Sequence, residues 1–169
     1  EGVRILVNDG RAVFRDLTFA QSSCRGGHSV ALADVDGDGW VDLYVCNYRQ
    51  RALMDMPNAR ATFSGAGPNR AVATLDGRPT TAPDLTNRFI VNAAGGLEEQ
   101  GEPDVLYRNQ GGTNFTETTW TGGAFLDEDG RTLTEPPRDW GLAAQFCDVN
   151  GDGRPDLYVC NDFHSPDRF

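Results

Sequence analysis

Short apolar and β-branched runs bounded by Gly, Asp and Asn recur along the chain, and no stretch carries the period of a long amphipathic helix. Residues 43–45 and 157–159 both read Leu-Tyr-Val and predict strands. Each follows an acidic loop, and each loop follows a small, apolar segment, residues 27–33 or 141–147. These two segments predict inner strands that pack face to face. The pattern predicts an all-β protein built from short antiparallel strands.

One segment of the chain occurs twice. Residues 34–47 read DVDGDGWVDLYVCN and residues 148–161 read DVNGDGRPDLYVCN, an offset of 114 residues. A second pair, residues 5–14 and residues 106–115, repeats at an offset of 101. The offsets differ by 13 residues, so we expect an insertion in the later copy that includes the polar hairpin-like run 125–131. Self-similarity of this kind indicates a repeat architecture.

We expect four strands per repeat unit: one before the acidic loop, one after it, one of the Leu-Tyr-Arg-Asn type, and one beginning at Phe115. Residues 28–119 then form one complete unit. Residues 1–27 hold the end of a preceding unit and a connection, and residues 120–169 hold a connection and the first half of the next.

Residues 48–103 interrupt the complete unit between its second and third strands. The excursion is far longer than an ordinary connection. An Asp76-Gly77 turn predicts a small hairpin over residues 73–78, and residues 88–91 predict a short strand. The insertion is interpreted either as an elaboration packed against the sheet or as a binding surface.

The two acidic loops share the pattern D-x-[DN]-x-D-G-x-x-D, which places oxygen side chains at positions one, three, five and nine. A tight turn directs alternate side chains toward one point, and oxygen ligands without His or Cys favour Ca²⁺ over zinc or copper. We therefore predict two Ca²⁺ sites. The predicted ligands are Asp34, Asp36, Asp38, Asp42 and the carbonyl of Trp40 in the first loop, and Asp148, Asn150, Asp152, Asp156 and the carbonyl of Arg154 in the second.

A solvated turn is the alternative interpretation of an acidic run, but two copies with matching flanks favour a metal. Carboxylates held this close repel one another unless a cation is present. An EF-hand needs Glu at position twelve and flanking helices, whereas Val45 and Val159 occupy that position in strand-like runs. Dockerin-like loops open helices, and these loops open strands.

Taken together, the acidic loop, the strand after it and the Leu106-Tyr-Arg-Asn…Phe115 segment resemble the FG-GAP and VCBS repeats of calcium-binding β-propellers, the class of the integrin α-subunit propeller. The sequence is most similar to bacterial secreted proteins that resemble cartilage acidic protein. The resemblance implies four-stranded propeller blades, about two blade-equivalents of a seven-bladed ring, with Ca²⁺ between the first and second strands of each blade.

The same resemblance implies an extracellular, cell-surface or periplasmic location and a role in binding, adhesion or scaffolding rather than catalysis. A propeller closes with about four to eight blades. We therefore expect the remaining blades from a longer chain or from neighbouring subunits, and a protein or glycan as ligand.

Composition narrows the chemistry further. The formal net charge is −10, which disfavours nucleic acid as a partner, and all 15 basic residues are Arg, which excludes lysine-based catalysis. No run is long enough to span a membrane. The four cysteines form no C-x-x-C motif, so disulfides and free thiols both stay open; they are Cys24, Cys46, Cys147 and Cys160.

Two other functions are considered. A calcium-dependent polysaccharide lyase or hydrolase would need cationic and phenolic groups, and Tyr48, Arg49 and Arg51 form the one cluster to test. A subunit of a filament or larger assembly is the other. The acidic run Glu98, Glu99 and Glu102 is predicted to be a solvated face, and Asp162, His164 and Asp167 either extend the second metal site or form a strand-terminal turn.

Overall fold

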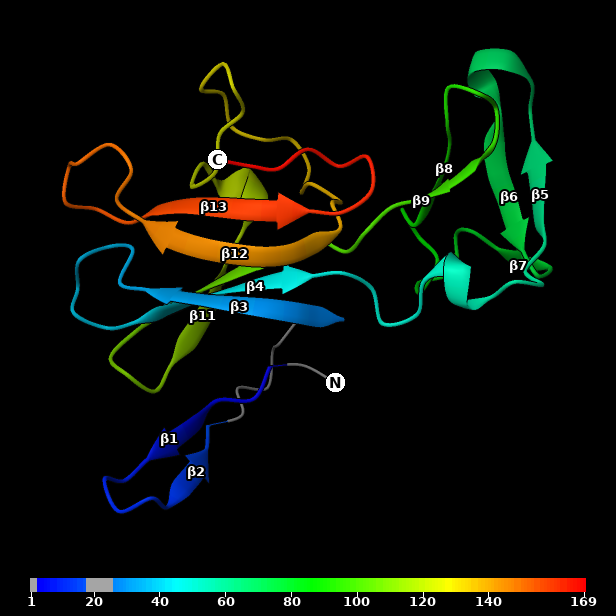
Figure 1. The fold of residues 1–169 in the computed structure, drawn as a ribbon. Coiled ribbons are helices and arrows are strands. Elements are labelled where there is room, and N and C mark those ends of the chain that lie inside the picture. Colours follow the sequence, from blue (N-terminus) through cyan, green and yellow to red (C-terminus); the bar gives the residue numbers. More distant parts are fainter. Residues whose placement is uncertain (1–2, 18–25) are drawn as a thin grey trace.

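The computed structural model describes residues 3–17 and 26–169 and is all-β, as predicted from the sequence (Figure 1). The strands form several small antiparallel sheets, none of them closed. The described helices are three short 3₁₀ turns: η1 (Leu53–Asp55), η2 (Gly67–Asn69) and η3 (Trp120–Gly122).

The largest sheet contains four strands from residues 27–118. They are β3 (Gly27–Ala33), β4 (Asp42–Asn47), β10 (Val105–Asn109) and β11 (Phe115–Thr118). Their order in the sheet is β11-β10-β4-β3, and every neighbouring pair is antiparallel. The four segments expected to be strands therefore pair as one sheet in chain order, with the insertion lying between β4 and β10.

Strand β4 is the centre of the core, because all of its residues are buried. Successive side chains of a strand point to opposite faces. Leu43 and Val45 therefore pack with Val105 and Tyr107 on one face. Tyr44 and Cys46 pack on the other face with Ala31 and Leu106.

A hairpin from the second repeat covers the Tyr44 face. It consists of β12 (Gly141–Cys147) and β13 (Asp156–Asn161), and its Val159 joins the buried cluster around Tyr44. The rings of Tyr44 and Phe146 meet edge to face, with centroids 6.5 Å apart. Val3 and Ile5 pack against the opposite face, just before the small hairpin β1 (Leu6–Asn8) and β2 (Phe14–Asp16).

Strand β3 differs from its prediction as an inner strand. It lies at the edge of its sheet, and Val30 and Leu32 are 55% and 63% exposed. Val30 pairs with Val45 and Leu32 with Leu43, so the side chains of Val30 and Leu32 lie on the same face of the sheet as those of Leu43 and Val45. The β12–β13 hairpin covers the other face, so only Ala31 of these three is buried.

The insertion forms a separate lobe on one side of the sheets (Figure 1). This insertion lobe, residues 48–103, contains β5 (Ala61–Ser64), β6 (Ala71–Leu75) and β7 (Arg78–Pro79) in one sheet, and β8 (Phe89–Val91) and β9 (Leu97–Glu99) in another. The predicted turn is confirmed: Leu75 pairs with Arg78 across Asp76 and Gly77, which have φ of 50° and 76°. Positive φ at both central residues is typical of an Asp-Gly hairpin turn.

A repeated Pro-Asp pair, which the sequence analysis missed, directly precedes β10 in the first unit and the bridging residue Arg168 in the second. Asn47 donates through Nδ2 to the carbonyl of Pro103, and Asn161 donates to that of Pro166, both at 2.7 Å. The bridge between Val159 and Arg168 mirrors the pairing of Val45 with Val105. Asp104 and Asp167 lie 63 residues apart and the two loops 114 apart, so the insertion lobe adds 51 residues to the first unit.

Candidate metal loops and their surroundings

The first acidic loop joins β3 to β4 and is folded around the carboxylate of Asp34. One oxygen, Oδ1, accepts hydrogen bonds from the backbone N–H of Gly37 at 2.8 Å and of Asp38 at 3.1 Å. The other, Oδ2, accepts from Gly39 at 2.8 Å. Gly37 and Gly39 have φ of 76° and 89°, a region that glycine occupies without steric cost, so the sequence DGDG suits this turn.

The second loop, between β12 and β13, repeats this arrangement bond for bond. Asp148 Oδ1 accepts from Gly151 at 2.7 Å and from Asp152 at 3.1 Å, and Oδ2 accepts from Gly153 at 2.8 Å. At position five of each loop, Asp38 accepts from the N–H of Trp40 and Asp152 from that of Arg154. The two copies of the motif therefore form the same turn.

Three of the predicted ligands come together in the first loop. Asp34, Asp36 and Asp42 each place a carboxylate oxygen within 4.8 Å of the others, whereas Asp38 is outside this group. Asp42 is fully buried and accepts from the N–H of Asn109 at 2.8 Å. Within the described chain, the acids of the second loop form no such group. Its third position is Asn150, an amide that adds no repulsion.

The donors of the first loop fit a hard cation. Every side chain in the group offers carboxylate oxygen, and each carboxylate keeps at least one lone pair beyond those used by the backbone N–H groups. Asp34, Asp36 and Asp42 would hold Ca²⁺, with Asp38 and the carbonyl of Trp40 at the adjacent positions of the turn.

Strand β10 braces the first loop through residues that the sequence analysis did not assign to the site. Asn109 donates through Nδ2 to the carbonyl of Val41 at 3.0 Å, and Arg108 forms an ion pair with Asp36. A Cβ atom on Gly112 would lie 2.6 Å from the Trp40 ring, so glycine lets that ring lie against the β10–β11 turn. Arg108 and Asn109 belong to the repeated Leu-Tyr-Arg-Asn segment, and this repetition is the sequence signal that could have pointed to them.

A buried carboxylate lies at the other end of β4. Asp104 accepts from the Tyr44 hydroxyl at 2.9 Å and from the N–H of Asn47 at 2.7 Å. Burial raises the pKa of Asp104 to about 6, even though both hydrogen bonds favour the charged form. Asp167 makes the same two contacts with Tyr158 and Asn161, and there the hydrogen bonds lower its pKa.

We expect the substitution Asp104→Asn to alter the pH dependence of stability. Because the native pKa lies above the ordinary value of 3.8, the folded protein binds more protons between about pH 4 and pH 6, and stability from this group falls as pH rises through that window. Relative to the variant, the wild type should lose about 2 kcal/mol between pH 4 and 7. Urea unfolding in chelator measures this difference.

Asp167→Asn is the matched control, and its effect should have the opposite sign. Because the pKa of Asp167 is lowered in the folded protein, this group stabilises the fold at pH values above its ordinary pKa of 3.8, and the stabilisation is lost as pH falls below that value. If the free energy of unfolding depends on pH in the same way in wild type and in Asp104→Asn, then burial does not raise the pKa of Asp104.

The cluster considered for polysaccharide chemistry lies in the stem of the insertion lobe. The Arg49 side chain is only 5% exposed; it donates to Glu102 at 2.6 Å and to the carbonyl of Gln100 at 2.6 and 3.1 Å. Arg51 accepts through its carbonyl from Arg88. The Tyr48 hydroxyl donates to Asp162 at 3.1 Å. Arg49 is thus an internal anchor that is not exposed to a substrate.

The expected solvated acidic face is wrong for Glu99. Its side chain is 6% exposed and lies between Arg88 at 2.6 Å and Arg49 at 3.5 Å. Glu98 is close to the His164 ring, 2.8 Å from Nε2, and Asp167 belongs to the Asn161 turn. Asp162, His164 and Asp167 therefore form contacts at the end of a strand, which matches the strand-terminal turn.

Three cysteines have free thiols: Cys46, Cys147 and Cys160. Cys46 is buried in the core, which accords with its repeated position in the central strand. Cys24 lies outside the described residues.

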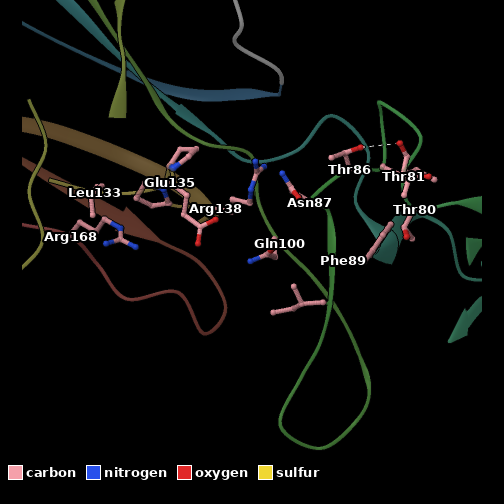
Figure 2. Close-up of a pocket in the computed structure, with 14 residues that line it drawn as sticks. Thr80, Thr81, Thr86, Asn87, Phe89, Gln100, Leu133, Glu135, Arg138 and Arg168 are labelled. Carbon is pink, nitrogen blue, oxygen red and sulfur yellow. Dashed lines mark hydrogen bonds between the residues drawn. The ribbon is translucent and has the colours of Figure 1, made fainter. Parts of the chain in front are cut away.

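A cavity of about 790 Å³ separates the insertion lobe from the segment before β12 (Figure 2). Thr80, Thr86 and Asn87 line the lobe side, and Glu135 and Arg138 line the other. The wall is rich in hydroxyl, amide and guanidinium groups, which suit a polar ligand.

The comparisons with known proteins matched no family model, no curated protein and no solved structure. None of the helices in the described part of the chain has the length and apolar character needed to cross a membrane.

Proposed function

We propose that this chain is a calcium-stabilised β-propeller segment with a non-catalytic binding or scaffolding role. The observation that carries the proposal is the shared turn of the two acidic loops, which repeat the same backbone hydrogen bonds around Asp34 and Asp148. Each loop joins the first and second strands of its unit. The acidic group of Asp34, Asp36 and Asp42 supplies the ligands that Ca²⁺ prefers.

The packing of the sheets supports a ring of blades. Strand β4 is buried on both faces, by the following hairpin on one face and by residues before β1 on the other. Val30 and Leu32 of β3 are exposed apolar residues that a further sheet could cover. The remaining blades would come from a longer chain or from neighbouring subunits, in an extracellular, cell-surface or periplasmic setting.

The ligand surface that we propose is the cavity beside the insertion lobe. Its threonine hydroxyls and the amides of Asn87 and Gln100 both donate and accept hydrogen bonds, as the hydroxyl groups of a glycan require. A protein loop with polar side chains would use the same groups.

The test is thermal and urea unfolding of the 169-residue chain with Ca²⁺ or with chelator. Ca²⁺ at ten times its Kd should add about 1.4 kcal/mol for each occupied loop, and Kd should fall near 10⁻⁴–10⁻³ M, roughly as for other extracellular modules. Mg²⁺ at equal concentration is the control, since its small octahedral shell suits these loops less well. Identical unfolding curves in Ca²⁺ and in chelator would contradict the proposal.

A further inference from the structure

The ion pair between Arg108 and Asp36 places a cation of the protein beside the first loop. Nη2 of Arg108 contacts Oδ2 of Asp36, which is one of the three grouped carboxylates. Arg108 lies on β10, far from the loop in sequence, and the pairing of β10 with β4 brings it there. A positive charge of the protein itself therefore lies among the carboxylates proposed to bind a divalent cation.

The rest of the Arg108 side chain is weakly held. Its Nε is buried and has no hydrogen-bond partner among the described residues. Arg49, by contrast, uses Nε and both terminal nitrogens in hydrogen bonds. An arginine that serves only to fix the fold would be expected to satisfy its buried donor, because an unpaired buried N–H is costly. Arg108 is thus held by the charge of Asp36 more than by a complete set of hydrogen bonds.

Among the described residues, the second loop forms no ion pair of this kind at its third position. Its third position is Asn150, which is uncharged and places its amide nitrogen 3.2 Å from Asp152. The two loops have the same turn, but their third position is an acid paired with Arg108 in the first loop and an uncharged amide in the second.

We infer that Arg108 is an internal counter-cation of the first loop, one that holds the loop formed without metal and competes with Ca²⁺ for Asp36. This inference rests on the proposed function, because it concerns the same loops. Ca²⁺ then fills the first loop only when it displaces the guanidinium from Asp36.

Calorimetric titration with CaCl₂ tests the inference in an Asp148→Asn background, where only the first loop should bind. Removal of the guanidinium by Arg108→Gln should tighten binding by about tenfold, because one unit charge beside a divalent ion is lost. In chelator the same variant should unfold at lower urea than its parent, since the carboxylates lose their counter-charge. A purely structural arginine would give the second effect without the first.

Arg78→Gln is the matched control. It removes the same charge, but Arg78 belongs to β7 and pairs with Asp84, and β7 lies in the insertion lobe, well away from the β3–β4 loop (Figure 1). Its Ca²⁺ affinity should equal that of the parent. Unchanged or weaker binding in Arg108→Gln overturns this inference and leaves the proposed function intact, whereas absence of Ca²⁺ binding in every protein, wild type included, overturns both.

Discussion

Substitution of Arg49 by Ala is expected to lower the free energy of unfolding by about 3–5 kcal/mol, since it breaks a buried ion pair by removing one partner. Arg49 is 5% exposed and contacts two carboxylates, Glu99 at 3.5 Å and Glu102 at 2.6 Å. Its guanidinium also donates to the carbonyls of Gln100 and Gly101. Without the Arg49 guanidinium, these two carbonyls lose a hydrogen-bond donor, and Arg88 alone compensates the negative charge of Glu99.

Urea unfolding of Arg49→Ala and Arg78→Ala measures the difference between a buried and an exposed pair. Arg78 and Asp84 are both more than half exposed, so Arg78→Ala should lower the free energy of unfolding far less than Arg49→Ala does. Arg49→Lys should fall between wild type and Arg49→Ala, because an ammonium cannot reproduce the planar fork. Equal losses for the two alanine variants would mean that Arg49 is solvated, and the substrate-binding interpretation would regain support.

Replacement of Gly101 by Ala is expected to lower the free energy of unfolding by about 3 kcal/mol. This is at the upper end of the range for a methyl group added to a well-packed region. Gly101 lies between β9 and β10, at the stem of the insertion lobe, and its N–H donates to the carbonyl of Arg138 at 3.1 Å. An added Cβ would overlap the carbonyl oxygen of Asp139 and lie 2.5 Å from its carbonyl carbon. Backbone atoms cannot move aside as the end of a side chain can.

Gly96→Ala provides the comparison within the same lobe. A Cβ there would have the Asn92 side chain as its nearest neighbour, at 3.4 Å, so a loss below about 1 kcal/mol is expected. Denaturant midpoints of the two variants give the result. A small loss for Gly101→Ala would show that the stem and residues 138–140 are not in contact, and the cavity between them would then have a different shape.

The strands could be predicted because each carries its own local signal. The Leu-Tyr-Val runs and the Asp-Gly turn at 76–77 fix a strand or a hairpin from a few neighbouring residues, and β12 spans the predicted 141–147. The burial of β3 could not be predicted in the same way. Val30 and Leu32 have the composition of core residues, and only the position of neighbouring sheets decides which face of the strand is covered.

The parts of the site that the sequence did not reveal depend on contacts between distant residues. Glu99 lies in an acidic run that has the composition of a solvated face, but Arg49 and Arg88 neutralise it from elsewhere in the insertion lobe. The Pro-Asp pairs at 103–104 and 166–167 escaped notice because 51 extra residues shift one copy relative to the other. The ligand pattern of the loops was visible, whereas the contact of Arg108 with Asp36 requires the register of β10 on β4.

Native mass spectrometry of the 169-residue chain in Ca²⁺ tests the central claim most directly, because it counts bound ions. We predict two Ca²⁺ per chain that chelator removes, and one Ca²⁺ in each of the single variants Asp34→Asn and Asp148→Asn. A wild-type chain that binds no Ca²⁺, or two ions that remain bound when both loops carry these substitutions, would contradict it.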